Sequence, residues 1–254
     1  MPRAVILGCS HALGAEMDLE PGLEWTADDR SQWHWGPLNS YPALLAQALG
    51  YTVENHAISG GSNDAVFRVF ASLFTHDYRT GSYHANLTPE DVVIACWTGP
   101  YRTEVWHSRD HLWLPLAAGI EQILTRVADP VLREGLAIPG TVRDEQLYLS
   151  YLQQWVAVAA EEQTGRLNKI KNILALNALA AAHGITVINI DSFAPVVNFE
   201  FPSTIFWPVQ VDFVTWAEQR QAPKTAYGHY FKPTHEAFAA EVLSAVQNRP
   251  VDHA

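Results

Sequence analysis

Short apolar runs alternate with amphipathic segments along most of the chain. Ala4–Gly8 is apolar, with β-branched residues at its centre, and Asp91–Cys96 and Ile185–Ile190 are comparable runs. Tyr51–His56, which follows Gly50, is also expected to be a strand. Apolar runs of this length are typical of buried strands in a parallel sheet. The pattern therefore predicts four such strands, spread from the beginning of the chain to its last third.

Amphipathic segments and cap residues between these runs predict helices. The predicted helices, with their cap residues where one is identified, are 41–49 (capped by Ser40 and ended by Gly50), 63–74 (capped by Asn63 or Asp64), 111–127, 144–182 with a break near 164–165, and 233–247. The segment 193–216 is aromatic, contains proline and has no clear period, so it is predicted to be loop.

Alternating strands and helices predict an α/β fold, a three-layer α/β/α sandwich around a mainly parallel sheet. The chain has 254 residues, which favours one domain over 1–254, with a helical insertion at about 140–183. Ligand chemistry in such folds lies at the carboxyl ends of the strands. We therefore expect the functional residues at that edge of the sheet.

Composition narrows the classes of partner. Hydrophobic residues make up 48% of the chain and charged residues 17%, so a sizeable core is expected. Sixteen basic against 27 acidic residues give a net charge of −11, which disfavours nucleic acid and anionic membrane surfaces. No apolar stretch is long enough for a signal peptide or a membrane span. The chain is therefore expected to be soluble and cytoplasmic as synthesised, unless cell lysis or a virion carries it out.

Cysteine and histidine usage indicates neither a disulfide framework nor a metal site. Cys9 and Cys96 end strands expected to be neighbours, so a disulfide is conceivable after oxidation, although two small buried side chains are the favoured interpretation. None of the eleven histidines has metal-ligand spacing with a third ligand, so no metal or other cofactor is expected. Oligomeric state is left open by these features.

Chemistry-bearing residues follow three predicted strands and precede the last helix. Ser10 follows the first strand, in the run Gly8-Cys9-Ser10-His11-Ala12-Leu13-Gly14. Glycines and polar residues follow the second strand, Trp97-Thr98-Gly99-Pro100-Tyr101-Arg102 follows the third, and Gly228-His229 lies before the last helix. A serine hydroxyl is a poor nucleophile unless a base such as histidine accepts its proton.

This serine-first, histidine-last order, with glycine-bearing loops between, resembles the SGNH (GDSL-like) hydrolase family. Ser10 matches the family's nucleophile, and His229 matches its catalytic histidine better than His235 does. Asn55 to Gly60 is similar to the second block, so the resemblance implies that the Gly60 backbone N–H contacts the oxyanion, with Gly61 as the alternative. Two short runs also resemble a branch often met in phage genomes: Ser59-Gly60-Gly61-Ser62-Asn63-Asp64 and the Trp-Thr-x-Pro-x-Arg run that begins at Trp97.

Two family features are absent from their usual places. The third block should carry Gly-x-Asn, but this chain has Trp97-Thr98-Gly99, and Thr98, Arg102, Asn63 or a backbone N–H are the candidate replacements. The acid that usually precedes the histidine is also missing. A backbone carbonyl, Asp191 or Asp212 could orient the imidazole instead.

The resemblance implies a serine esterase that works through an acyl-enzyme on Ser10, without a metal. Arg102 could be an ordinary ion-pair partner or could hold an anionic substrate group. Five tryptophans could stack on sugar rings or on an acyl chain, although most are expected to pack in the core or a lid; they are Trp25, Trp33, Trp35, Trp97 and Trp106. If at least two of them line the cleft, an O-acetylated carbohydrate is the expected substrate. Two alternatives stay open: a degenerate SGNH-like domain that binds glycan or serves as a phage structural part, and an acyltransferase using the same serine.

Overall fold

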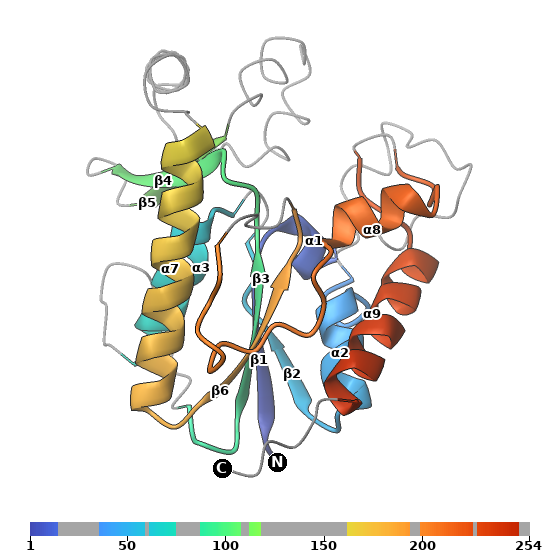
Figure 1. Ribbon diagram of the computed structural model, residues 1–254, viewed down its shortest axis with the longest axis horizontal. Coiled ribbons are helices and arrows are strands. Elements are labelled where there is room, and N and C mark those ends of the chain that lie inside the picture. The colour runs from blue at the N-terminus through green and yellow to red at the C-terminus, as the bar shows by residue number, and fades with distance from the viewer. Residues whose placement is uncertain are drawn as a thin grey trace.

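A computed structural model describes residues 1–14, 36–58, 61–74, 87–107, 112–117, 162–193, 199–225 and 228–248. The elements, labelled as in Figure 1, are β1 (Arg3–Leu7), α1 (Ser10–Leu13), α2 (Tyr41–Ala48), β2 (Thr52–Asn55), α3 (Asn63–Ser72), β3 (Val92–Trp97), β4 (Arg102–His107), β5 (Leu112–Ala117), α7 (Glu162–Ala182), β6 (Thr186–Asp191), α8 (Phe213–Gln219) and α9 (Lys232–Gln247).

A four-stranded parallel sheet with the order β2-β1-β3-β6 forms the centre of the molecule. Its strands are the four predicted from the sequence, each within one or two residues of the expected ends. All six residues of β3 are buried, because helices cover both faces of the sheet. The predicted α/β class with a mainly parallel sheet is confirmed.

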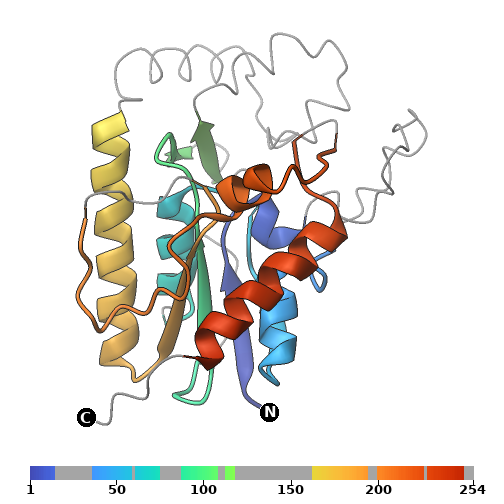
Figure 2. The same cartoon turned by 45° about the vertical axis from the view of Figure 1, so that its right-hand side comes forward.

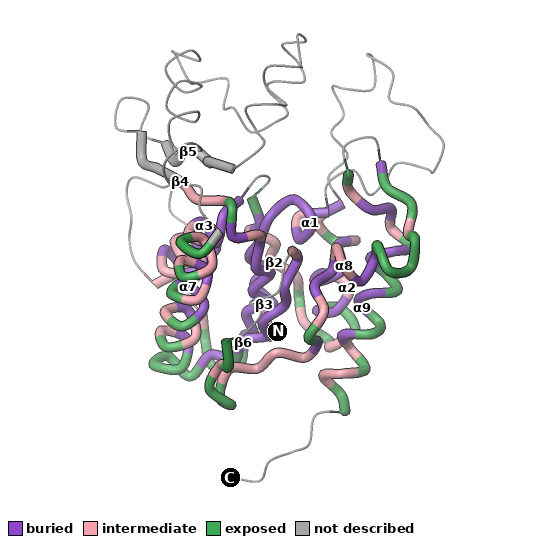
Figure 3. The backbone as a smooth tube through the Cα atoms, turned by 45° about the horizontal axis from the view of Figure 1, so that its top comes forward, coloured by how far each residue is buried: buried purple, intermediate pink, exposed green. Residues whose placement is uncertain are grey.

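Helices form one layer on each side of this sheet (Figures 1 and 2). Alternate strand residues point to opposite faces, so Val5 and Leu7 pack with α3 and α7, whereas Ala4 and Ile6 pack with α2 and α9. Figure 3 shows the buried strands at the centre and the exposed residues on the outer sides of the helices. The fold is therefore a three-layer α/β/α sandwich with two apolar cores.

Helix α7 belongs to one of these layers. Its residues Ile173, Leu176 and Ala180 recur at three- and four-residue spacing and are fully buried against the sheet. The helix also continues through Gly165, where a break was predicted. A Cβ there would lie 2.0 Å from the Pro100 carbonyl oxygen, so the glycine permits close approach to the loop after β3. Residues 162–182 of the predicted insertion thus form a layer helix, and 140–161 lie outside the described residues.

Two helix starts differ from prediction. Ser62 caps α3, its hydroxyl accepting the Ala65 N–H at 3.0 Å, so neither Asn63 nor Asp64 is the cap. Helix α8 begins within the predicted loop 193–216, and Asp212 caps it by accepting the Thr215 N–H at 2.9 Å. An aspartate before an apolar run is a helix-start signal that the aromatic character of the segment obscured.

The predicted helix at 111–127 is wrong over its first part. Leu112–Ala117 is strand β5, paired antiparallel with β4 in a separate two-stranded sheet, and 118–127 lie outside the described residues. Pro115 lies in the middle of β5, where it would break a helix. The hairpin places Arg102, at the start of β4, beyond the carboxyl end of the main sheet.

Cys9 and Cys96 are both buried and free. Burial raises the pKa of the Cys96 thiol, which keeps it protonated at neutral pH. This agrees with two small side chains that fill space in the core. Among the described helices, none combines the length and apolar character needed to cross a membrane.

Candidate active site

Ser10 lies at the carboxyl end of β1, on the first residue of the short helix α1 (Figure 1). The turn into this helix is tight: a Cβ on Gly8 would lie 2.6 Å from the Ala12 Cβ and 2.9 Å from the Cys96 Cβ. Only glycine fits at that position without moving its neighbours. Ser10 itself is 6% exposed, so its hydroxyl lies in a nearly closed environment.

The Ser10 hydroxyl meets the His229 imidazole. Ser10 Oγ and His229 Nε2 are 2.9 Å apart, a hydrogen-bond distance between residues separated by 219 positions in sequence. If Nε2 accepts the serine proton, the neutral ring carries its own hydrogen on Nδ1. This is the arrangement that a serine nucleophile and its general base require.

A short loop fixes the position of His229. The Thr225 N–H donates to the His229 carbonyl at 2.8 Å, and the Thr225 hydroxyl accepts the His229 N–H at 3.1 Å. Gly228 has a φ of +86°, a left-handed conformation that glycine adopts without strain. Lys224 and Tyr230 close the loop with an antiparallel bridge. The imidazole is thus held from its backbone.

His11, directly after the serine, packs on the same imidazole. The His11 and His229 ring centroids lie 5.0 Å apart with the rings tilted by 64°. Burial, followed by repulsion from His229, lowers the pKa of His11 well below its usual value, so His11 is neutral at pH 7. Phe193 lies on another side of the His11 ring, at 4.8 Å between centroids. The sequence assigns His11 no role, and its position directly after Ser10 is the one feature that places it near the site.

The structure describes two of the three candidate oxyanion donors Gly60, Gly61 and Asn63, and both already use their N–H groups in other hydrogen bonds. Gly60 lies outside the described residues, and the Gly61 N–H already donates to the Ile58 carbonyl at 2.8 Å. Asn63 accepts the Thr98 N–H at 2.9 Å and donates to the Thr98 and Gly99 carbonyls at 3.2 and 3.4 Å. The Asn63 amide therefore cross-links the loop after β3, and neither it nor Gly61 offers a free donor.

Thr98 retains an unused polar group. Its hydroxyl is buried and has no hydrogen-bond partner in the part of the chain that the structure describes. A buried hydroxyl without a partner is uncommon and often marks a functional position. Thr98 therefore stays a candidate replacement for the side chain missing from the third block.

His235 has a structural position. Its Nδ1 accepts the Tyr41 N–H at 3.1 Å, at the first turn of α2, while the ring packs on Tyr41 and Phe213. Burial, followed by repulsion from His229, lowers the pKa of His235 to about 3. The ring is neutral at pH 7 and caps a neighbouring helix, so it is not placed as the base for Ser10.

The two aspartates considered as orienting acids differ in their partners. Asp191 forms a buried ion pair with Lys169, and burial raises its pKa to about 6 despite this lysine. Asp212 caps α8 with one oxygen, whereas its Oδ2 is buried and has no hydrogen-bond partner among the described residues. Asp191 thus stabilises the surroundings of the site, and Asp212 stays a candidate orienting acid.

Trp97 is a core residue. It is fully buried in the α3–α7 core, and its indole N–H donates to Asn189 Oδ1 at 3.0 Å, so it cannot stack on a sugar ring. Trp25, Trp33 and Trp35 lie outside the described residues, as does the side chain of Trp106.

Arg102 and Phe193 border the dyad on the side of the β4–β5 hairpin. The Arg102 guanidinium carbon lies 5.0 Å from the centre of the Phe193 ring, which in turn contacts His11. Lys169, besides binding Asp191, donates to the Phe193 carbonyl at 3.2 Å and so holds this segment in place. The sequence does not distinguish Lys169 from other lysines of a helix, so its contact with the Phe193 carbonyl was not predicted. Among the described residues, no group of three or more potential metal ligands is present.

No protein-family model matches the chain, and no curated protein matches it significantly. Solved structures do match. An acetyl xylan esterase (Est2A) from the rumen bacterium Butyrivibrio proteoclasticus is 10% identical with a TM-score of 0.50, over 98% of this chain and 64% of that one. At this identity the match shows a shared α/β/α architecture. The chain therefore shares its overall fold with this esterase.

Two further structural matches are weaker. A family two carbohydrate esterase from Cellvibrio japonicus is 14% identical, with a TM-score of 0.45 over 97% of this chain and 61% of that one. A protein described as a lipolytic protein of the G-D-S-L family, from Desulfitobacterium hafniense, is 13% identical, with a TM-score of 0.40 over 96% and 99% of the two chains. This chain spans just under two thirds of the two carbohydrate esterases. The phage-associated branch receives no support from these matches.

Proposed function

We propose that this SGNH-like chain is a serine esterase with Ser10 as nucleophile and His229 as general base. The observation that carries the proposal is the 2.9 Å separation between Ser10 Oγ and His229 Nε2 at the carboxyl edge of the sheet. A serine hydroxyl at hydrogen-bond distance from an imidazole nitrogen is the nucleophile–base geometry that acyl transfer requires.

The reaction follows from this contact. His229 Nε2 accepts the Ser10 proton while Oγ bonds to the ester carbonyl carbon, and the imidazolium then returns the proton to the departing alcohol. Water, deprotonated by the same Nε2, attacks the acyl-Ser10, and its proton returns to Ser10 when the carboxylic acid leaves. The Ser10 N–H is at the start of α1, where a helix N–H has no carbonyl partner within its own helix, so we propose it as one oxyanion donor. Gly60 is the second donor that the family resemblance implies.

One neighbour of the dyad, His11, permits a transient positive charge on His229. His11 is neutral, so it does not repel the imidazolium that forms when Ser10 loses its proton. The His11 ring lies 5.0 Å from the His229 ring, between centroids. The Thr225 contacts fix the backbone of His229, from which the imidazole extends toward Ser10.

The substrate we propose carries a small acyl group, an O-acetyl group on a carbohydrate. A serine that is 6% exposed leaves little room around Oγ, which favours acetyl over long acyl chains. The match to an acetyl xylan esterase fold supports a carbohydrate alcohol. Acetate release from an acetylated polysaccharide, compared with release from p-nitrophenyl butyrate and longer esters, tests this choice.

The activity is tested with p-nitrophenyl acetate and with a serine-directed fluorophosphonate. The wild type is expected to turn over the ester and to be labelled at Ser10, identified by mass spectrometry of the labelled peptide. Ser10→Ala and His229→Ala should lose at least about 10³-fold in kcat. Ser40→Ala is the matched control, because Ser40 is buried but its hydroxyl contacts only the Pro37 carbonyl, at 3.5 Å. That variant should keep labelling and turnover.

Other outcomes select the alternatives. A wild type that is neither labelled nor more active than the two alanine variants would exclude an esterase and leave a glycan-binding domain. Labelling at Ser10 with acyl transfer to an added alcohol, but without hydrolysis, would make the protein an acyltransferase.

A further inference from the structure

Arg102 differs from other arginines of this protein. Arg3 binds Glu54 and Asp91, Arg68 binds Glu104, and Arg220 binds Glu241. The Arg102 side chain has neither a hydrogen bond nor an ion pair with any described residue, and its Nη1 is buried without a partner. A buried donor left unsatisfied costs about 1–3 kcal/mol, so such a group usually has a purpose in the protein.

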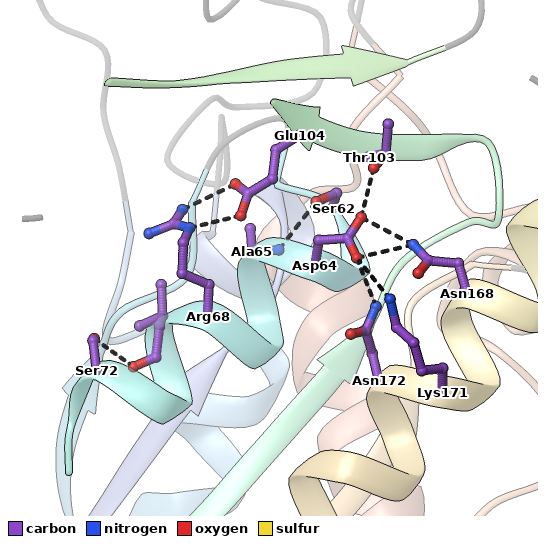
Figure 4. A network of polar contacts seen from close by, with 11 residues as sticks. Ser62, Asp64, Ala65, Arg68, Ser72, Thr103, Glu104, Asn168, Lys171 and Asn172 are labelled. Carbon is purple, nitrogen blue, oxygen red and sulfur yellow. Dashed lines mark hydrogen bonds and ion pairs between the residues drawn. The ribbon is translucent and has the colours of Figure 1, made fainter. Parts of the chain in front are cut away.

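The acidic side chains closest in sequence to Arg102 on its own strand and on α3 have other partners (Figure 4). Glu104 accepts two hydrogen bonds from Arg68, at 2.6 and 3.0 Å. Asp64 accepts from Thr103 at 2.6 Å. It also accepts from two side chains of α7, Asn168 at 2.9 Å and Asn172 at 3.0 Å. These acids are therefore not available to neutralise Arg102.

The same contacts fix the strand that carries Arg102. Thr103 and Glu104, the next two residues of β4, both bind side chains of α3 (Figure 4). The start of β4 is thus attached to a helix of the main layer. Phe193 lies against the guanidinium, at 5.0 Å from its carbon to the ring centre. An aromatic face and a fixed strand restrict where the charge can lie.

A continuous set of ring contacts connects Arg102 to the dyad. Phe193 lies 4.8 Å from His11, and His11 lies 5.0 Å from His229, between ring centroids. Burial lowers the pKa of His11 most, and the positive charge of Arg102 lowers it further, which agrees with this proximity. The guanidinium therefore lies within the reach of a substrate bound at Ser10.

We infer that Arg102 binds a carboxylate carried by the substrate, so that the ester this site prefers is anionic, such as a uronate-bearing glycan ester. This rests on the proposed esterase function and adds its charge selectivity. One guanidinium with one unsatisfied buried nitrogen matches a single negative charge, and its planar donors suit a carboxylate. The chain carries a net charge of −11 and so repels anions on average, whereas the unpaired Arg102 near the dyad attracts them locally.

The test compares anionic esters with neutral esters of similar size. On the acyl side the pair is mono-p-nitrophenyl glutarate and p-nitrophenyl valerate, and on the alcohol side it is 4-acetoxybenzoate and its methyl ester. In the wild type, kcat/KM should be about 10-fold or more higher for the anionic member of one pair. That pair identifies which part of the ester faces Arg102. In Arg102→Gln this ratio should fall at least about 10-fold, and Arg102→Lys should retain an intermediate preference.

Arg220→Gln is the matched control. Arg220 also lies over an aromatic ring, 4.1 Å from Trp216, but it is paired with Glu241. Its removal changes the net charge by the same amount, and the anionic-to-neutral ratio should stay as in the wild type. A wild type without charge preference, or a preference that survives in Arg102→Gln, would overturn the inference while leaving the esterase proposal intact.

Binding to the Ser10→Ala protein separates this inference from the proposed function. Calorimetric titration should show that 4-acetoxybenzoate or mono-p-nitrophenyl glutarate binds more tightly than its neutral counterpart. The difference should disappear in Ser10→Ala/Arg102→Gln. If the wild type proves inactive but this Arg102-dependent binding is present, the esterase proposal fails and the carboxylate site stands. Equal binding of charged and neutral compounds removes the carboxylate site.

Discussion

Thr225 binds the backbone of His229 from both sides. Its N–H donates to the His229 carbonyl at 2.8 Å, and its hydroxyl accepts the His229 N–H at 3.1 Å. The imidazole whose Nε2 lies 2.9 Å from Ser10 Oγ is therefore placed by a residue four positions earlier. Because Thr225 binds the backbone of His229, we expect its influence on catalysis to pass through the histidine.

Replacing Thr225 by valine keeps the shape and removes the hydroxyl acceptor. The backbone N–H of His229 then loses its acceptor, which lowers the stability of the folded protein by about 0.5–1.5 kcal/mol. The His229 backbone, and with it the imidazole, becomes less firmly positioned. We expect kcat on p-nitrophenyl acetate to fall about 3- to 10-fold with little change in KM. Thr225→Ser, which restores the acceptor, should recover most of kcat. An unchanged kcat in the valine variant would contradict the positioning role.

Gly8→Ala should destabilise the protein by about 1–3 kcal/mol, because the new Cβ would lie 2.6 Å from the Ala12 Cβ and 2.9 Å from the Cys96 Cβ. Gly99→Ala is the control, since its Cβ would meet only the Phe193 Cβ at an ordinary 3.7 Å. That variant should stay within about 0.5 kcal/mol of the wild type. Urea unfolding of the three proteins measures the difference, and equal stability of the two variants would refute the packing argument.

His235 makes stability depend on pH. Burial lowers the pKa of His235 to about 3 in the folded chain, against about 6.5 when unfolded. The unfolded state therefore binds an extra proton between these values, and the stabilising contribution, complete above pH 6.5, is lost as the pH falls toward 3. Each pH unit in this window costs at most about 1.4 kcal/mol per proton.

The variant His235→Gln isolates this contribution, because His11 titrates in both proteins. Its stability should fall less steeply between pH 6.5 and 4 than that of the wild type, as measured by denaturant unfolding at several pH values. Parallel curves would mean that His235 is protonated in the folded protein or has no shifted pKa.

Replacing only one member of the buried Lys169–Asp191 ion pair should destabilise the protein more than replacing both. Lys169→Met leaves an unpaired carboxylate in the core, and about 3–5 kcal/mol of stability should be lost at pH 8. The loss should be smaller at pH 5, because a protonated Asp191 needs no cation. Lys169→Met/Asp191→Asn should recover part of it. A double variant no more stable than the single one would show that the lysine acts through the Phe193 carbonyl instead.

The central sheet was predictable because its signal is local. Strands β1, β3 and β6 are apolar runs such as Val92–Trp97, mostly buried on both faces, so their residues alone indicate the structure, whereas β2 is only partly buried. The β4–β5 hairpin was missed because its two strands are stabilised by each other and by α3, through Thr103 and Glu104. Helix α8 was missed because aromatic residues hid the Asp212 cap.

The sequence predicted which segments contribute the serine and the histidine of the site, because these segments follow one another in a characteristic order. Parallel strands end at one edge, which explains why a serine after the first strand was expected there, and the structure places His229 beside it. Side-chain partners were not predictable. Asn63 lies close in sequence to the candidate oxyanion loop, yet its amide binds the backbone of Thr98, 35 positions away. Which backbone group the Asn63 amide binds depends on how the loops pack in the folded protein, and the sequence alone does not contain this information.

Ser10 and His229 lie 219 positions apart, so the dyad joins segments that are synthesised at very different times. During synthesis the serine emerges first, and it can meet the imidazole only after His229 has left the ribosome and the segment that carries it has packed against β1. A chain that stops before His229 therefore lacks the dyad, and under the proposed function ester hydrolysis would report that this long-range contact has formed.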